Sequence, residues 1–255
     1  MQTFYLYIIY FFIYSILGWC TEMIYCRICQ GKWTDRGFFY GPYCPIYGFG
    51  AIIIISFLTP FIDNILLVFL FGVILTTILE YLTSYFMEKI FDARWWDYST
   101  LPLNINGRVC LLNSFLFGML GLIIIYIIHP KIANLVSLIP YNFLPYITYA
   151  ITFIFAIDFA ATLITLFDLK SKLKDLKELG EQIHIKANES VKNMEIIKQL
   201  EEFKNDFIFK KNNLKNRLVN AFPNLKMKNL QSQLEELKQA IYNYQKEKKE
   251  KSKKN

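Results

Sequence analysis

Charged side chains are scarce in the first two thirds of this 255-residue chain. Residues 1–167 carry 7 Lys and Arg with 8 Asp and Glu, whereas residues 168–255 carry 21 and 13. Hydrophobic residues make up 54% of the chain and its mean hydropathy is +0.28, which is too apolar for a soluble domain of this size. This uneven distribution of charged residues excludes a free-standing soluble enzyme and indicates an integral membrane part followed by a polar, basic tail.

Cysteine and histidine are too few and too poorly spaced to suggest a disulfide framework or a metal site. All five Cys lie in apolar runs or in loops that we expect on the cytosolic side, where thiols stay reduced. Cys26 and Cys29 form one C-x-x-C pair, but there is no second pair, and His129 and His184 lie elsewhere. We therefore expect no metal and no cofactor.

The common motifs for nucleotide binding and catalysis are also missing. There is no G-x-x-x-x-G-K-S/T loop, no G-x-G-x-x-G after a strand, no H-E-x-x-H and no G-x-S-x-G. These absences argue against an enzyme, and if the protein works with ATP, a separate ATPase subunit must bind it. The basic tail carries no nucleic-acid-binding motif, so we expect it near anionic membrane lipid rather than on nucleic acid.

Five apolar runs are long enough, or nearly so, to cross a bilayer core of about 30 Å. The second run is short. Asp63 and Asn64 mark the turn after the second run, and Pro130 and Pro140 bracket a predicted loop before the fifth. We predict an all-α fold, an integral membrane helical bundle of about five spans. The spans cover about residues 4–26, 45–61, 65–90, 109–128 and 143–167.

The distribution of Lys and Arg between the loops predicts the orientation of the bundle, because basic loops stay in the cytosol. No basic residue precedes Arg27, and the loops after the first and third runs hold three each. The loop after the second run holds none, and the loop after the fourth holds only Lys131. We expect a multi-pass protein of the cytoplasmic membrane with its N-terminus outside and both long polar loops and the tail in the cytosol.

The tail carries three stripes of apolar residues at the steps of three and four that are typical of a helix face. Pro223 and Asn224 predict a break between the second and third stripes. We predict a cytosolic helical hairpin or coiled coil over residues 168–245, formed within one chain or between two, and a disordered basic end over residues 246–255. The stripes cover residues 166–183, 200–221 and 227–244.

Three carboxylic acids lie inside the predicted spans, namely Glu22, Glu80 and Asp158. Counted from the cytosolic ends at ~1.5 Å per residue, they lie about 8, 14 and 15 Å deep, all in the inner half of the membrane. A carboxylate in hydrocarbon is costly, so we expect each to face the bundle interior or a water-filled cavity. A helix–helix hydrogen bond, a salt bridge to a loop Arg, contact with a substrate or ion, and catalysis all remain open as roles.

The two predicted cytosolic loops, residues 31–50 and 92–108, mix aromatic residues, Gly and Pro with few charges. They either lie in the headgroup layer as an aromatic belt or dip back to roof a cavity over the buried acids. The order of span, acid, loop and span occurs twice, a faint duplication of the kind found in transporters. We expect Arg36 or Arg108 to pair with a buried acid or with Asp97.

Long strings around these acids resemble those of a known membrane protein family. Gly18 and Trp19 precede Glu22, DRGFFYGPYCPIYGFG forms the first loop, WWDYSTLPLNINGRVCLL forms the second, and NAFPNLK lies in the tail. Together they resemble the ABC-transporter type IV family, the CmpB-like bacterial membrane proteins. The resemblance implies a multi-spanning, permease-like protein of the bacterial cytoplasmic membrane and brings no catalytic residues with it.

The acids and the matching loop residues together form the candidate substrate-binding site. Within it, we expect Trp96 and Tyr40 to pack as walls of one cavity. The candidate residues are Glu22, Arg36, Tyr40, Tyr47, Glu80, Trp96, Asp97, Asn104, Arg108 and Asp158.

Three functions remain open. In the first, a homodimer of permease subunits forms a path and a separate ATPase supplies the energy, which the resemblance and the buried acids favour. In the second, a membrane enzyme or lipid-binding protein reads a phosphate headgroup with Asp35, Arg36, Asp97 and Arg108, since Arg suits phosphate by its bidentate fork. In the third, a membrane scaffold or sensor recruits partners through its helical tail.

Overall fold

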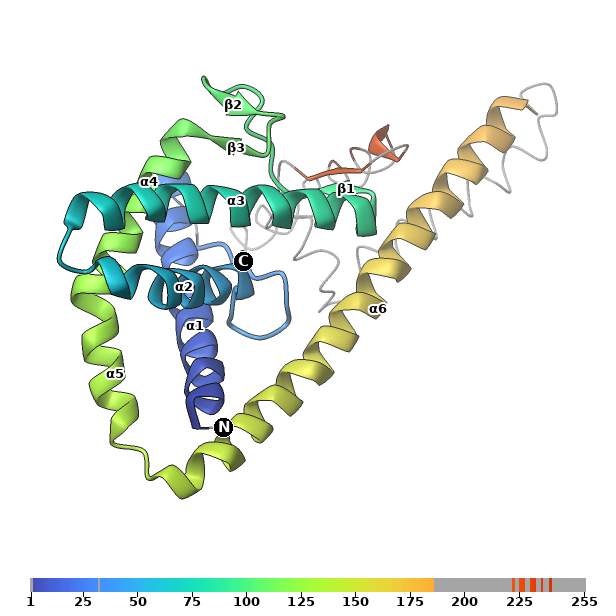
Figure 1. Ribbon diagram of the computed structural model, residues 1–255. Helices are drawn as coiled ribbons and strands as arrows, with labels where there is room; N and C mark the ends of the chain where they lie inside the picture. The colour runs from blue at the N-terminus through green and yellow to red at the C-terminus, as the bar shows by residue number, and fades with distance from the viewer. Residues whose placement is uncertain are drawn as a thin grey trace, which may run out of the picture.

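The computed structural model describes residues 2–185 apart from Lys32, together with short pieces of the tail between Phe222 and Gln239. This part of the chain is predominantly helical, as the sequence predicts (Figure 1). The hairpin of α2 and α3 crosses in front of α1, and the long α6 runs along the opposite side from α4 and α5 (Figure 1). The helices are α1 Gln2–Gln30, α2 Pro45–Leu58, α3 Ile65–Phe91, α4 Leu111–Ile123, α5 His129–Ser137 and α6 Leu144–Ile185.

Four helical runs among the described residues are long and apolar enough to cross a membrane, which makes the chain a multi-pass membrane protein. They are Thr3–Ile28, Ile65–Phe91, Leu111–Ser137 and Tyr141–Asp175. The expected second span is a shorter apolar helix, Pro45–Phe61, made of α2 and the 3-10 turn Thr59–Phe61. At ~1.5 Å per residue, the 14 residues of α2 reach about 21 Å, short of the bilayer core.

Local chemistry explains where α3 begins and ends. Asn64 has extended backbone angles and its side-chain oxygen accepts a hydrogen bond from Leu67 N at 3.2 Å, so it caps the first turn. Asp92 ends the helix in the left-handed region at φ 51°. The turn that the sequence places at residues 63–64 is therefore correct, and the loop that follows Asp92 starts at a defined angle.

The fourth span differs from the prediction in both of its ends. Val109–Cys110 form a short strand, β3, paired antiparallel with β2, Asn104–Ile105, so the helix begins only at Leu111. The helix then passes through a π-helical turn, Ile124–Ile128, into α5, and the predicted loop from Pro130 onward is wrong. Pro130 is accommodated because its missing N–H falls at the start of α5, just after the turn that interrupts the regular ladder.

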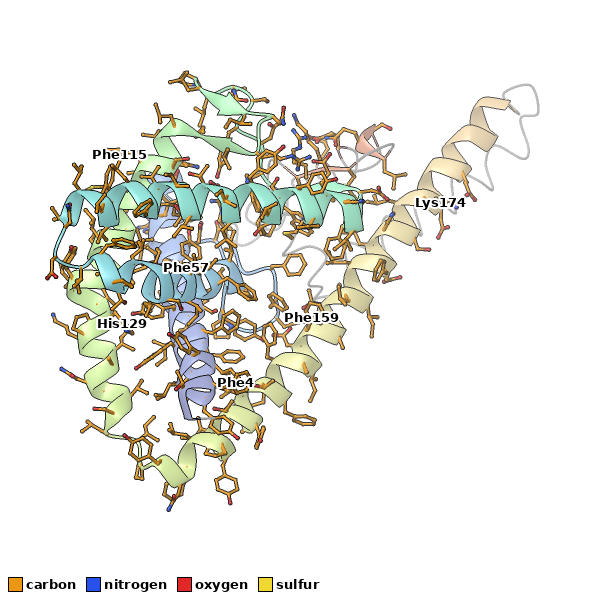
Figure 2. All side chains as sticks on the ribbon, viewed as in Figure 1. Phe4, Phe57, Phe115, His129, Phe159 and Lys174 are labelled. Carbon is orange, nitrogen blue, oxygen red and sulfur yellow. The ribbon has the colours of Figure 1, made fainter. Side chains whose placement is uncertain are left out.

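Apolar side chains form both the interior of the bundle and much of its outer surface. A buried cluster joins α1, α2, α3 and the α4–α5 region, and includes Tyr14, Leu58, Val68 and Ile125. Outward-facing aromatic residues remain exposed, including Phe57 at 61% and Phe115 at 51%, both labelled in Figure 2. Such exposed apolar rings suit contact with lipid hydrocarbon and not with water.

Two glycines let neighbouring helices approach closely. A Cβ at Gly48 of α2 would lie 2.3 Å from Ser15 Oγ and 2.6 Å from Phe11 O of α1. A Cβ at Gly118 of α4 would lie 2.3 Å from Val73 Cγ2 of α3. Helix α1 therefore packs closely against α2, and α3 packs closely against α4.

Helix α6 carries the last span onward into the tail, as the first apolar stripe predicts. Its 42 residues reach about 63 Å, and Leu166, Leu169 and Leu173 are buried against the loop after α3. Described pieces of the tail return to the same place, because β4, Lys226–Met227, pairs antiparallel with β1, Ala93–Arg94.

The third apolar stripe does not start as a helix. Met227 lies in β4, opposite Ala93, and helical geometry is described only from Gln231 onward. The edge of β1 offers hydrogen-bonding groups to an extended segment, and this tertiary pairing outweighs local helical periodicity. The second stripe, 200–221, and the basic end, 246–255, lie outside the described residues.

Candidate functional site

Glu22 of α1 is held by the first loop and by α2. Arg36 Nη1 lies 3.3 Å from Glu22 Oε2, and Tyr47 donates a hydrogen bond to Glu22 Oε1 at 2.6 Å. Tyr47 can approach because Gly18 has no side chain, since a Cβ there would lie 2.3 Å from Tyr47 Cγ. A loop arginine thus pairs with an acid of the first span, with the Arg36 and Glu22 side chains 24% and 25% exposed.

The loop between α1 and α2 is fastened at its start by a second carboxylate. Asp35 Oδ1 accepts hydrogen bonds from Trp19 Nε1 at 2.8 Å and from its near neighbour Gly37 N at 3.0 Å. The indole of α1 therefore sets the path by which Arg36 reaches Glu22.

Asp158 of α6 fastens the far side of the same loop. Its Oδ1 accepts from Tyr40 N at 2.9 Å, and its Oδ2 accepts from Gly41 N at 2.7 Å and from the Tyr43 hydroxyl. Thr162 of the next helical turn donates to Oδ1 at 3.1 Å. Burial raises the pKa of Tyr43 and its hydrogen bond to Asp158 raises it further, so the phenol remains a donor.

Glu80 of α3 has far fewer partners than the other two acids. Its side chain is 4% exposed, and its Oε1 accepts one hydrogen bond, from the Tyr98 hydroxyl at 3.1 Å. Its Oε2 is buried and has no hydrogen-bond partner within the described part of the chain. Burial raises the pKa of Tyr98, and the nearby Glu80 raises it further, so Tyr98 also remains a donor.

Arg108 enters the interior beside the next turns of α3. Its Nη2 lies 2.9 Å from Glu88 Oε2 and its Nη1 donates to Ser84 Oγ at 3.3 Å. Its guanidinium also lies 5.7 Å from the ring centre of Tyr81 and 5.5 Å from that of Tyr85. Arg108 is thus neutralised and enclosed by α3, one and two turns away from Glu80 along the same helix face.

Asp97 connects the second loop to the tail. It accepts hydrogen bonds from Lys226 Nζ at 2.6 Å and from Ser99 N at 3.0 Å, with Arg94 Nη1 at 3.8 Å. Partial burial alone raises the pKa of Asp97, but the hydrogen bonds from Lys226 and Ser99 outweigh it and lower the pKa to about 2. The carboxylate is therefore ionised at neutral pH and holds β4 against the loop.

Trp96 and Asn104 shape the second loop from within. Trp96 Nε1 donates to Arg108 O at 3.0 Å. Asn104 Nδ2 donates to Leu101 O at 2.7 Å, and its Oδ1 accepts from Gly107 N at 3.0 Å. Gly107 has φ 66°, and a Cβ there would lie 2.5 Å from Asp97 Oδ1, so this turn requires glycine.

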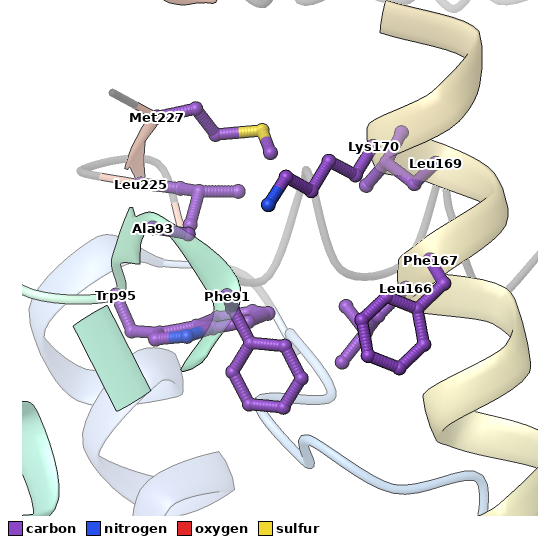
Figure 3. Close-up of a pocket in the computed structure, with 9 residues that line it drawn as sticks. All are labelled: Phe91, Ala93, Trp95, Leu166, Phe167, Leu169, Lys170, Leu225 and Met227. Atoms are coloured by element: carbon purple, nitrogen blue, oxygen red, sulfur yellow. The ribbon is translucent and has the colours of Figure 1, made fainter. Parts of the chain in front are cut away.

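Trp96 and Tyr40, expected as walls of one cavity, make hydrogen bonds to different elements, and neither lines the pocket described at this end of the bundle. Tyr40 turns to α6, where its hydroxyl lies 3.0 Å from Thr165 Oγ1, whereas Trp96 is bonded to Arg108 O. The pocket described at this end of the bundle is apolar, and Lys170 reaches across it from α6 (Figure 3). It is lined by Phe91, Ala93, Trp95, Leu166, Phe167, Leu169, Lys170, Leu225 and Met227.

The candidate residues gather at one end of the bundle in three groups. Glu22, Arg36 and Tyr47 form one, Asp158 and Tyr40 form another, and the remaining five lie along α3 and the second loop. The candidate list omitted Ser84, Glu88 and Lys226, and it omitted Tyr98 although this residue lies in the family string of the second loop. The spacing of Glu80, Ser84 and Glu88 at steps of four could have revealed the polar face of α3.

Among the described residues, no group of three or more His, Cys, Asp and Glu side chains lies close enough to hold a metal ion. The carboxylates instead lie in separate groups, each contacted by donors from a loop. The arrangement can bind protons, cations or polar groups and has no nucleophile paired with a base in these contacts.

Comparison with known proteins agrees with this architecture. A family model with the description "Putative ABC-transporter type IV" matches residues 9–163, which contain Glu22, Glu80 and Asp158. No curated protein and no solved structure matches the chain. Because the matched segment covers more than half of the 255 residues and includes both loops that carry the site, the chain belongs to this ABC-transporter type IV family.

Proposed function

We propose that this protein is the membrane-embedded, permease-like part of a transport system, with a polar site at the loop end of its helices and no ATPase of its own. The observation that carries the proposal is the placement of Glu22, Glu80 and Asp158 inside apolar helices, each contacted by a polar group from a loop or from α2. Ionisable groups at membrane depth mark substrate or ion paths. The family description supports the same function.

The contacts of the arginines favour a permease over a headgroup-binding protein. Arg36 is engaged by Glu22, and Arg108 is engaged by Glu88 and Ser84. A phosphate group would have to compete with these carboxylates for the same donors. Two buried side-chain atoms of the site have no hydrogen-bond partner among the described residues, Arg36 Nε and Glu80 Oε2. Because the charge of Arg36 is already paired with Glu22, the acid without a counter-charge is Glu80, which points to a cationic or protic substrate rather than an anionic one.

The tail gives less support to a scaffold that recruits partners. Its described residues Leu225, Met227 and Leu230 are buried against β1 and α6 of their own chain. Apolar positions that are covered in this way are not available to another protein. The sequence pattern supports an orientation with these loops and the tail in the cytosol.

The hairpin of β2 and β3 is the surface that suits a separate ATPase. It projects from the loop end of the bundle (Figure 1), and its first strand and the residue before that strand expose Ile105 at 57% and Leu103 at 73%. Exposed apolar residues on a projecting hairpin are a suitable anchor for a soluble partner. Homodimers of such a subunit would bring two hairpins to one pair of ATPase subunits.

Affinity capture of the tagged full chain from native membranes tests the proposal. We expect an ATPase subunit to co-purify with the native chain and to be lost with Leu103→Asp/Ile105→Asp. Leu138→Asp is the matched control, because Leu138 is equally apolar and 77% exposed but lies at the opposite end of α4 and α5. Capture without any ATPase, or an ATPase retained by the double variant and lost with Leu138→Asp, would contradict the proposal.

A further inference from the structure

Glu80 has fewer described hydrogen-bond and ion-pair partners than any other acid in the candidate site. Glu22 has a guanidinium and a phenol, and Asp158 accepts from two backbone N–H groups and two hydroxyls. Glu80 has a single neutral donor, the Tyr98 hydroxyl, and one oxygen with no partner in the described part of the chain. A charged carboxylate buried in this way would be strongly disfavoured.

The three arginines of the two loops, Arg36, Arg94 and Arg108, are paired with other acids. Arg108 binds Glu88 and Ser84 and lies over the Tyr81 and Tyr85 rings, and Arg94 binds Glu88 at 3.1 Å. Arg36 binds Glu22 on the far side of Tyr47. None of these described contacts brings a positive charge to the Glu80 carboxyl group.

The other groups around the Glu80–Tyr98 pair are uncharged donors and acceptors or weak acids. Tyr47 of α2 lies within electrostatic range of Tyr98, and Cys110 and Asn113 lie beside Tyr98 from β3 and α4. On the neighbouring face of α3 and α4, the Thr77 hydroxyl is hydrogen-bonded to Ser114 Oγ at 2.8 Å. The described contacts of the Glu80–Tyr98 pair therefore come from uncharged groups.

We propose that Glu80 is a proton-binding site within the membrane, occupied at neutral pH as the uncharged carboxylic acid and held by Tyr98. The proton resides on Oε2, while Oε1 accepts the hydrogen bond from Tyr98. Release forms the carboxylate and delivers one proton to water, and it requires that water or a cationic substrate reach Oε2. This inference does not depend on an ATPase partner, so it can fail or succeed independently of the proposed function.

Infrared spectroscopy of the purified full chain at pH 7 tests this inference directly, because a protonated carboxyl group has a C=O stretch separate from that of a carboxylate. We expect this band in the native protein and its loss in Glu80→Gln, which keeps the size and removes the titratable group. The matched control is Glu88→Gln, two turns further along the same face of α3, whose native carboxylate is ion-paired to Arg108 and which should leave the band unchanged.

A second variant keeps the test decisive if Glu80→Gln folds poorly. Tyr98→Phe removes only the hydroxyl that donates to Oε1, so the band should remain but shift to higher frequency. Absence of the band from the native protein at pH 7, its persistence in Glu80→Gln, or its loss in Glu88→Gln would each overturn the proposal.

Discussion

Replacement of Arg108 by Met should destabilise the whole loop end of the bundle. The methionine keeps the apolar stem but removes the guanidinium that binds Glu88 at 2.9 Å and lies over Tyr81 and Tyr85. The Arg108 side chain is 11% exposed and that of Glu88 is 32% exposed, so the pair lies between the surface and buried cases. Glu88 keeps one partner in Arg94, which limits the cost of its remaining charge.

The loss in free energy of unfolding can be estimated from these contacts. Surface pairs contribute about 0–1 kcal/mol and loss of one partner of a buried pair costs about 3–5 kcal/mol. Each cation–π contact adds about 0.5–1 kcal/mol. We therefore expect a loss of about 2–4 kcal/mol, which for a chain of this size corresponds to a decrease in Tm of about 5–15 °C.

Thermal unfolding of the purified variants in one detergent, at one scan rate, measures this effect. Lys174→Met is the matched control, because the Lys174 side chain is 71% exposed and lies 3.9 Å from Glu178, a pair worth less than about 0.5 kcal/mol. Arg108→Met/Glu88→Gln should recover part of the loss, since the carboxylate is then neutral. Equal Tm values for Arg108→Met and Lys174→Met would refute the reasoning.

Three further perturbations test other contacts. Asp158→Asn replaces one accepting oxygen by an NH2 group, so one of the Tyr40 and Gly41 amides loses its acceptor at a cost of about 1–3 kcal/mol. Hydrogen exchange at those amides should accelerate, whereas the exposed Asp63→Asn should leave it unchanged. For Asp97, the folded pKa of about 2 lies below the unfolded value of about 3.9, so its hold on Lys226 is complete above about pH 4 and is lost as pH falls through 2. The ring centre of Trp95 lies 5.0 Å from that of Phe222, so the fluorescence of Trp95 should change when the tail is released. A Lys226→Ala chain should show no such fluorescence change between pH 4 and 2. In intact cells and a cysteine-free background, Asn64→Cys and Asn134→Cys should be labelled from outside and Thr34→Cys and Ser99→Cys protected, and outside labelling at Thr34→Cys would reverse the orientation.

Long-range features of composition were sufficient to locate the membrane helices. Apolar runs at residues 65–90 and 143–167 coincide with α3 and with the first part of α6, because a bilayer span needs a continuous apolar segment and little else. The turn at Asn64 was equally accessible, since an Asn side chain caps the following helix by a contact only three residues away. The family strings likewise pointed to the loops that carry the site.

Secondary-structure predictions from local sequence patterns were wrong at two places, where a helix distortion or a pairing with another element outweighed the local preference. Pro130 was expected to end a helix, but a π-helical turn just before it leaves the helix intact. Met227 was expected in a helix, but it pairs with Ala93 of β1 and lies in strand β4. In both cases the deciding contact or distortion is not visible in the helical spacing of apolar residues along the chain.

The partners of the acids were decided only by the tertiary structure. Buried depth predicted that Glu22, Glu80 and Asp158 would face the interior, but it could not assign Arg36 to Glu22 and Arg108 to Glu88. Each pairing depends on how far a loop bends back over the helix ends, and this path is set by contacts as distant in sequence as Asp158 and Tyr40. The periodicity of side chains along a helix predicts which face a residue occupies. Which charged residue pairs with it depends on how distant segments pack together in the folded chain.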